Sequence, residues 1–128
     1  MAAKPQGLIG PLRHLSRLFE ANGKAEDALA CEERVLKIEE ETRGAKDPGL
    51  ADTLRAIARL SVMQQDYPRA TELYERLTDL LTRKLGKNDP GLLEDLEYLA
   101  ELLEYAGERK KAQTLRERCA KIRKKAGR

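Results

Sequence analysis

Apolar positions along this chain repeat with a period of 42 residues. Asp47-Pro48-Gly49-Leu50 returns unchanged as Asp89-Pro90-Gly91-Leu92. At the same offset, apolar residues recur in three copies: Leu12/Leu54/Leu96, Leu15/Ile57/Leu99, Leu18/Leu60/Leu102 and Ala28/Ala70/Ala112. A period of about 20–50 residues is typical of repeat architectures, in which each unit buries its apolar face against the next. We therefore expect a flexible lead-in over residues 1–6 and one domain over 7–128, with repeats at about 7–46, 47–88 and 89–128.

Each repeat contains two amphipathic stretches. In the central copy, leucine and isoleucine at helical spacing predict one helix over about 50–64 and a second over about 68–85. Asp47 suits the N-cap of the first helix, Pro48 its first position, and Gly86 the residue just past the end of the second. The same register predicts helices over about 10–22, 25–42 and 109–125, with hairpin loops at 22–24, 65–67 and 106–108. The chain is thus predicted to be all-α, built from three helical hairpins.

The residues at these positions resemble the tetratricopeptide repeat. The matching positions of the central copy are Leu54, Ile57, Ala58, Ser61, Ala70, Tyr74 and Leu77. The long period and the Gly-x-x-Asp-Pro joint are similar to the form found in kinesin light chains. This resemblance implies a right-handed superhelix that acts as a protein-interaction scaffold, with the first helices of the hairpins lining a concave groove. The chain departs from the family at Glu32 and Arg116, where the family usually places an aromatic residue.

Composition narrows the class of protein further. The chain is 41% hydrophobic and 37% charged, with a net charge of +3 and no tryptophan. It has neither the roughly 20-residue apolar run of a membrane span nor a signal-peptide pattern. Cys31 and Cys119 lie more than one repeat apart, so we interpret them as small buried hydrophobes rather than a disulfide or metal site. These features predict a cytoplasmic address and no cofactor.

Catalytic residues are not evident in the sequence. His14 is the only histidine, and no Gly-rich phosphate loop, metal-ligand spacing or nucleophile motif is present. Glu97 and Glu101 lie one helical turn apart but on an expected open surface. We therefore do not expect an enzyme.

Acidic and basic residues are concentrated on different predicted helices. The second helix of the first copy carries an acidic outer face, which we interpret as a solvated face: Glu32, Glu33, Glu39, Glu40 and Glu41. The last helix, residues 109–125, carries nine basic residues against the single acidic Glu117. Part of this basic charge is expected near a helix C-terminus, where it offsets the helix dipole.

Two rows of charge are expected along the groove. At the 42-residue offset they are Arg13–Arg55–Glu97 and Arg17–Arg59–Glu101. Like charges one turn apart destabilise a helix by a few tenths of a kcal/mol, so two such arginine pairs at equivalent positions suggest an anionic partner. We expect these arginines to be exposed and unpaired and to bind an acidic peptide, with Met63, Tyr98 and Tyr105 as an apolar anchor. Alternatively, Arg55 and Arg59 pair with Glu97 and Glu101, and the charges only decorate the surface.

Two further functions remain open. A structural or self-associating array would stack through Leu8 and Ile9 at one end and Leu115 and Ile122 at the other, giving a weak homo-oligomer. Polyanion binding, to RNA or acidic lipid, would use the basic last helix. The small net charge and the lack of aromatic residues in that helix disfavour nucleic acid. The leading interpretation is a scaffold that binds an acidic peptide.

Overall fold

The computed structural model describes residues 5–127, and these form α-helices and short 3-10 turns without a strand. The helices are α1 (Ile9–Ala21), α2 (Ala25–Arg43), α3 (Ala51–Met63), α4 (Tyr67–Leu85), α5 (Leu93–Tyr105) and α6 (Arg109–Ala126). The predicted all-α fold of three hairpins is confirmed. Of the expected lead-in, residues 1–4 lie outside the described part, and Pro5–Leu8 form a 3-10 turn, η1.

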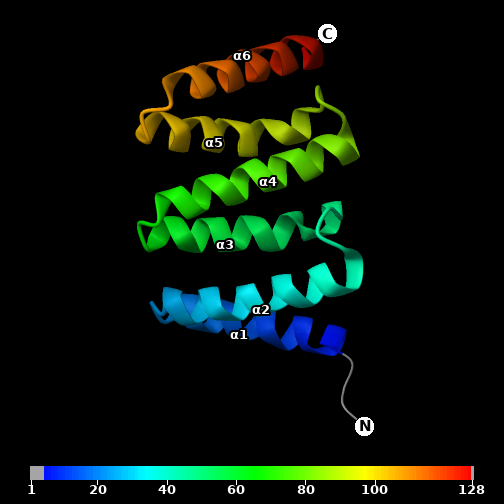
Figure 1. Ribbon diagram of the computed structural model, residues 1–128, viewed down its shortest axis with the longest axis vertical. Coiled ribbons are helices and arrows are strands. Elements are labelled where there is room, and N and C mark those ends of the chain that lie inside the picture. Colours follow the sequence, from blue (N-terminus) through cyan, green and yellow to red (C-terminus); the bar gives the residue numbers. More distant parts are fainter. Residues whose placement is uncertain (1–4, 128) are drawn as a thin grey trace.

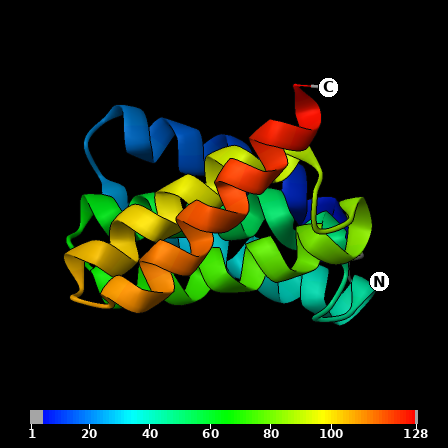
Figure 2. The same cartoon turned by 90° about the horizontal axis from the view of Figure 1, so that it is seen from above.

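The helices stack in chain order along the long axis of the molecule (Figure 1). Turns within the hairpins lie along one edge of the stack, and the connections between repeats lie along the other. Seen from above, α6 crosses the stack obliquely (Figure 2). The first and last described residues therefore lie at opposite ends, as expected when each repeat contacts only its neighbours.

The two connections between repeats have the same structure, and we call residues 44–50 the first joint and 86–92 the second joint. Gly44 and Gly86 follow α2 and α4 with φ of +92° and +90°. Asp47 then accepts a hydrogen bond from the backbone N–H of Gly49 at 2.6 Å, and Asp89 one from Gly91 at 2.7 Å. The aspartates cap the 3-10 turns η2 (Pro48–Leu50) and η3 (Pro90–Leu92), which lead into α3 and α5. Gly86 lies just past the end of α4 as predicted, whereas Asp47 and Pro48 begin the 3-10 turn η2 and the N-cap of α3 is Leu50.

The core is most complete around the central repeat. Leu54, Ile57 and Leu60 of α3 are fully buried, as are Ala58 and Ala70, where α3 and α4 approach each other. Both cysteines are free and buried, as predicted from the sequence. The expectation that Ile122 is available for stacking is wrong, because it is fully buried against Leu92, Leu96 and Cys119.

The first repeat has an incompletely covered face. Leu15 and Leu18 of α1 are 42% and 48% exposed. Their equivalents one and two repeats later, Ile57/Leu99 and Leu60/Leu102, are all buried. In the second and third repeats, the preceding repeat covers these positions through the α2–α3 and α4–α5 contacts. Helix α1 has no such neighbour among the described residues.

The acidic face of α2 is only partly in solvent. Glu33 and Glu41 are exposed, but Glu32 and Glu39 are 5% and 3% exposed. The expectation of a solvated face is therefore wrong for these two residues. They lie on the side of α2 that faces α1 and α3, and both belong to the site described next.

Candidate protein-interaction site

The four arginines predicted to form an anion-binding strip lie on α1 and α3, and three of them have carboxylate partners. Arg13 donates from Nη2 to Glu39 Oε2 at 3.2 Å and to Thr53 Oγ1 at 2.9 Å. The Thr53 hydroxyl in turn donates to Glu39 Oε1 at 2.5 Å. The buried carboxylate of Glu39 thus has a donor on each oxygen, and the cluster joins α1, α2 and α3.

Arg55 makes the equivalent connection one repeat later. It donates from Nε and Nη2 to the two oxygens of Asp95, at 2.9 and 2.7 Å. Its Nη1 also donates to Asp52 at 3.0 Å. Hydrogen bonding to Asp95 raises the pKa of the Arg55 guanidinium above its usual value, although partial burial opposes this shift. Because Thr53 and Asp95 are 42 residues apart, Arg13 and Arg55 reach the same position on the next repeat.

Arg59 points in the other direction along the stack. Its guanidinium forms a two-pronged contact with Glu20 of α1, including a 3.0 Å hydrogen bond from Nη2 to Oε1. This hydrogen bond lowers the pKa of Glu20 and raises that of Arg59. Arg17 is exposed and has no ion-pair partner among residues 5–127. Of the four arginines, only Arg17 therefore fits the expectation of an unpaired guanidinium.

The alternative interpretation, in which Arg55 and Arg59 pair with Glu97 and Glu101, also differs from the structure. Glu97 pairs with Arg123 of α6 instead of Arg55. Glu101 is exposed and forms no ion pair within the described chain. The carboxylates actually used lie on α1, α2, α3 and α5. The sequence did not lead us to expect Glu39 and Asp95 as partners of the arginines. Thr53 and Asp95 occupy equivalent repeat positions, 42 residues apart, and this equivalence could have indicated a shared contact.

A hollow of about 330 Å³ opens between α1 and α3, and we call it the α1–α3 hollow. It is lined by Arg13, Ser16, Arg17, Glu20, Glu32, Asp52, Thr53, Ala56 and Arg59. Three arginines surround it, and Glu32 of α2 lies at its base. The Oε2 atom of Glu32 is buried and has no hydrogen-bond partner. Burial raises the pKa of Glu32 above its usual value, while Arg13 opposes the shift.

The repeat register explains why this hollow exists. One repeat later, the positions of Glu32 and Ala56 are occupied by Tyr74 and Tyr98. Those two rings, on α4 and α5, contact each other with centroids 4.9 Å apart and occupy the position equivalent to the hollow. Burial of the hydroxyl raises the pKa of Tyr74 to about 12. Where α4 and α5 present this aromatic pair, α2 and α3 present only the carboxyl group of Glu32 and the methyl group of Ala56, and the space between them stays open.

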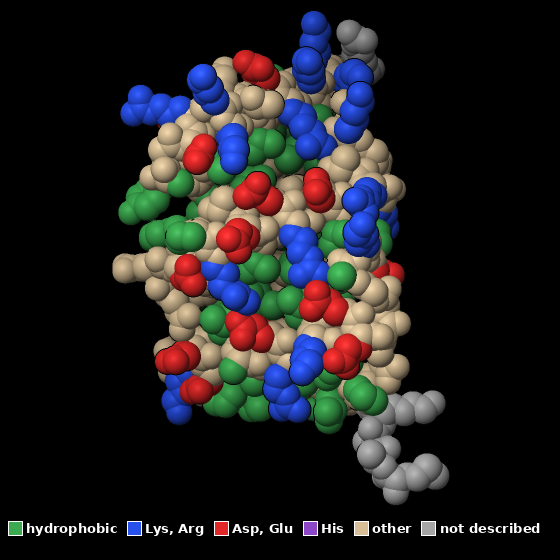
Figure 3. All heavy atoms as spheres, in the orientation of Figure 1, with side chains coloured by type: hydrophobic (Ala, Val, Ile, Leu, Met, Phe, Trp, Pro, Cys, Tyr) green, Lys and Arg blue, Asp and Glu red, His purple; other side chains and the backbone are tan. Residues whose placement is uncertain are grey.

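The remaining predicted residues do not gather around this hollow. Tyr105 is 75% exposed, its ring centroid lies 4.9 Å from that of Tyr67, and it lines a separate hollow beside α4. Met63 is also exposed, whereas Tyr98 is half-buried in its contact with Tyr74. Figure 3 shows acidic and basic side chains interleaved over one face, with basic side chains gathering towards the α6 end. The predicted strip is therefore a series of local charge clusters.

Residues 5–127 contain no group of three or more potential metal-ligating His, Cys, Asp or Glu side chains. None of the helices in this part of the chain combines the length and apolar character needed to cross a bilayer.

Comparison with known proteins identifies the repeat. The model of the tetratricopeptide repeat family matches residues 9–83. One similar structure contains nearly identical TPR-like repeats of a kinesin light chain from Podosopora anserina. It is 23% identical in sequence to this chain, with a TM-score of 0.76. BtubC (BKLC) from P. vanneervenii is 22% identical, with a TM-score of 0.79. These similarities show the shared fold.

The matches differ in extent from the chain described here. They cover 98% and 97% of this chain, but 59% and 49% of the Podosopora and P. vanneervenii chains, respectively. The protein thus spans about half to three fifths of the length of these similar structures. No curated protein matches the chain.

Proposed function

Because the chain belongs to the tetratricopeptide repeat family, we propose that it is a non-catalytic interaction scaffold that binds a partner peptide with an acidic side chain in a concave groove. The observation that supports this proposal is the α1–α3 hollow, where Arg13, Arg17 and Arg59 surround a space whose equivalent position one repeat later is occupied by an aromatic pair. We also propose a cytoplasmic location, as expected from the sequence.

Arg17 is the residue best placed to make the first contact with an acidic side chain. Arg13 and Arg59 are already oriented by Glu39 and Glu20, so they lose little conformational freedom when a ligand arrives. An entering carboxylate can accept from all three guanidinium groups, which are strong charge-assisted donors. When Glu32 is protonated, it can donate a further hydrogen bond from the base of the hollow.

The peptide would continue along α3 and α5. In this arrangement Arg55 takes a second acidic group, and Met63, Tyr98 and Tyr105 provide apolar contacts. Glu97 and Glu101 lie at the far end and would favour a basic residue there. The groove is thus expected to be bipolar, with its cationic part on the first two repeats.

The test is binding of a fluorescein-labelled peptide of six glutamates, measured by fluorescence anisotropy. Charge reversal at Arg17 alone is the sharpest variant, because Arg13, Arg55 and Arg59 also hold repeats together. Arg17→Glu should weaken binding about tenfold. Raising the salt from 0.1 to 1 M should weaken binding to the wild type, since the screening length falls from about 10 Å to about 3 Å. Lys37→Glu on the exposed face of α2 is the matched control. Equal affinities for the wild type and Arg17→Glu would remove the hollow as the binding site.

A second candidate function is self-association, which the exposed apolar face of α1 favours. Leu8, Leu15 and Leu18 are 40%, 42% and 48% exposed, and the last two occupy positions that are buried in the other repeats. Stacking of a second copy against this face would complete the missing repeat contact.

A further inference from the structure

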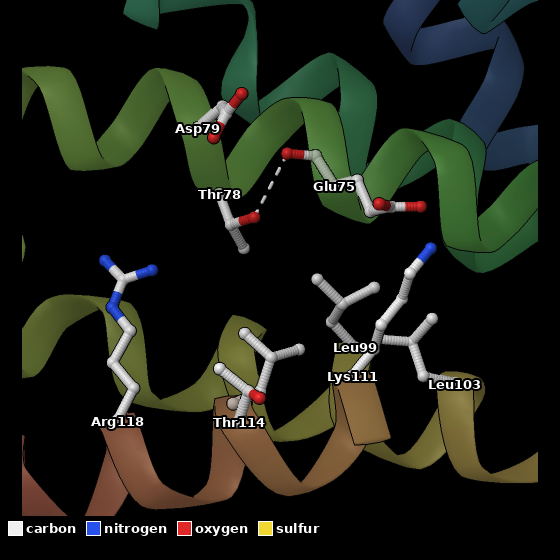
Figure 4. Close-up of a pocket in the computed structure, with 9 residues that line it drawn as sticks. Glu75, Thr78, Asp79, Leu99, Leu103, Lys111, Thr114 and Arg118 are labelled. Carbon is white, nitrogen blue, oxygen red and sulfur yellow. Dashed lines mark hydrogen bonds between the residues drawn. The ribbon is translucent and has the colours of Figure 1, made fainter. Parts of the chain in front are cut away.

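A second groove runs between α4 and α6, and α5 forms its floor. Its central part is lined by Glu75 and Asp79 on α4, by Leu99 and Leu103 on α5, and by Lys111, Thr114, Leu115 and Arg118 on α6 (Figure 4). It adjoins an apolar hollow at one end through Glu75, Leu103 and Lys111. At the other end it adjoins a basic hollow through Thr114 and Arg118. We call the whole surface the α4–α6 groove.

Two ion pairs of the preceding repeat pair have no equivalent in this groove. Between α2 and α4, Arg69 contacts Glu33 at 3.0 Å and Arg76 contacts Glu40 at 2.6 Å. One repeat later the first pair becomes Lys111 and Glu75, which form no ion pair in the described chain although they face the same groove. The second pair becomes Arg118 and the neutral Thr82. The charged groups at the α4–α6 interface therefore remain available for a ligand.

The basic end of the groove lies at the second joint, and its charge differs from that of the first joint. The hollow at the first joint is lined by three cations and two carboxylates: Lys46, Arg76, Arg83, Glu40 and Asp79. The hollow at the second joint is lined by four cations and one carboxylate: Lys87, Arg118, Lys121, Lys125 and Glu117. At the 42-residue offset, Glu40 becomes Thr82 and Asp79 becomes Lys121. The same position in the fold thus changes from nearly balanced charge to a concentrated positive charge.

Arg118 is held in place by neutral groups. Its Nη2 donates to Thr82 Oγ1 at 2.9 Å and, more weakly, to the backbone carbonyl of Lys87 at 3.3 Å. Arg76 makes the corresponding carbonyl contact to Ala45 at 3.0 Å, but it also has the carboxylate of Glu40. Arg118 is therefore oriented without being neutralised, and Lys87, Lys121 and Lys125 beside it have no ion pair among residues 5–127.

We propose that the α4–α6 groove binds an extended segment of a protein partner that carries a phosphorylated side chain, with the phosphoryl group at the second joint. A phosphoryl group carries about two negative charges and three acceptor oxygens, so it can accept from Arg118 and from the lysines together. A single carboxylate would leave most of this positive charge uncompensated. Apolar side chains of the same segment would lie over Leu99, Leu103 and Leu115.

The shape of the groove favours a peptide over a polyanion. The distance from Lys111 to Lys125 along α6 is about 21 Å at 1.5 Å per residue, which an extended segment of about six residues covers. The apolar hollow at the opposite end from the phosphoryl site contains Tyr67, Pro68 and Tyr105 and lacks the continuous positive charge that a nucleic acid needs. Elsewhere on α6, Arg116 and Arg123 are neutralised by Glu104 and Glu97. Positive charge is therefore concentrated at one end of the groove.

The test uses fluorescein-labelled peptides of seven residues, with two leucines at one end and a phosphoserine at the other, synthesised in both sequence orders. Each has an unphosphorylated twin, and binding is followed by fluorescence anisotropy and by amide chemical shifts. In at least one order, the phosphorylated peptide should bind at least about tenfold more tightly than its twin. The shift changes should fall on the second joint and on α6. Equal binding of the twins, or no binding in either order, overturns the proposal.

Repeat-matched variants provide the controls. Thr82→Glu and Lys121→Asp install the acidic residue types of the first joint, so each should weaken phosphopeptide binding about tenfold without lowering the thermal midpoint. Lys125→Ala should also weaken binding, whereas Arg83→Ala, its counterpart at the first joint, should not. Tighter binding of a uridine decamer RNA or of vesicles containing phosphatidylserine than of the phosphopeptide would overturn the proposal in favour of a polyanion site. Arg17→Glu should leave phosphopeptide binding unchanged, which separates this site from the α1–α3 hollow.

Discussion

Arg55 on α3 and Asp95 on α5 form a two-pronged contact across the second pair of repeats, at 2.9 and 2.7 Å. The carboxylate is nearly buried, with 7% of its side chain exposed, whereas the arginine side chain is 38% exposed. Removal of the Arg55 guanidinium would leave the buried negative charge of Asp95 without its cationic partner. The pair is therefore expected to stabilise repeat stacking even if Arg55 also contacts a ligand.

Arg55→Ala should lower the free energy of unfolding by about 1–2 kcal/mol. This is less than the 3–5 kcal/mol typical of breaking fully buried pairs, because the guanidinium is partly in solvent. Asp95→Ala should have a similar effect, and the double variant should cost less than the two single changes added together. Urea denaturation of the four proteins measures this coupling. Strict additivity would show that the contact contributes little.

Glu32→Gln should stabilise the protein at neutral pH. The pKa of Glu32 in the folded state is raised by burial, so the native state binds a proton more tightly than the unfolded chain, whose glutamate pKa is about 4.3. Stability should therefore fall as the pH rises from the unfolded pKa through the folded pKa. The glutamine variant lacks this loss, and we expect a gain of about 1 kcal/mol at pH 7 that disappears near pH 4. A constant difference between the two proteins across this range would contradict the raised pKa.

Gly86→Ala should destabilise the second joint by about 1–3 kcal/mol. Gly86 has φ of +90° and ψ of 154°, a conformation that is strained for any residue with a Cβ atom. Gly10→Ala in α1 is the control, because no heavy atom lies within 4 Å of the added Cβ and Gly10 is not among the positive-φ glycines. There we expect a gain of up to about 1 kcal/mol. Thermal unfolding of both variants gives the comparison.

Leu60→Ala and Leu18→Ala should differ strongly although the two positions are equivalent in the repeat. Leu60 is fully buried, and truncation of such a leucine typically costs about 2–5 kcal/mol. Leu18 is about half exposed, so its truncation should cost less than about 1 kcal/mol. Similar losses at the two positions, measured by urea denaturation, would mean that the face of α1 is covered in solution.

Self-association through α1 is tested by sedimentation velocity over a range of protein concentrations. If copies stack on this face, the average mass should rise with concentration in the wild type, and Leu15→Glu with Leu18→Glu should remove the rise. The double variant should still fold, with a thermal midpoint only slightly lower, because both side chains are about half exposed. A wild type that stays monomeric at the highest concentration would falsify the stacking hypothesis.

The sequence predicted the helices and the joints closely because both are determined locally. Asp66 shows the limit of this approach: its carboxylate accepts from the backbone N–H of Arg69, so α4 begins at Tyr67, one residue earlier than predicted. The buried alanines also followed from the repeat register, since equivalent positions have equivalent neighbours.

The partners of the arginines could not be predicted in the same way. Long side chains reach one position or the next with nearly equal ease, and which carboxylate they contact depends on the rotation between successive repeats. Arg55 therefore pairs with Asp95 and Asp52 instead of Glu97. Burial of Glu32 was missed because the glutamate-rich helix α2 was interpreted as having one solvated face. Comparison with Tyr74, at the equivalent position, would have indicated burial.

The near-identity of the two joints has a consequence for how the molecule could lengthen. Gly44 and Gly86 have φ/ψ of 92°/154° and 90°/154°, and Asp47 and Asp89 have −76°/128° and −73°/128°. Equal backbone angles apply the same rotation and rise at each step, whatever side chains the helices present. Duplicating residues 47–88 in tandem would then extend the superhelix by one more equal step. The number of repeats and the chemistry of each surface can therefore vary independently, because the joints set the geometry and the helix side chains set the surface.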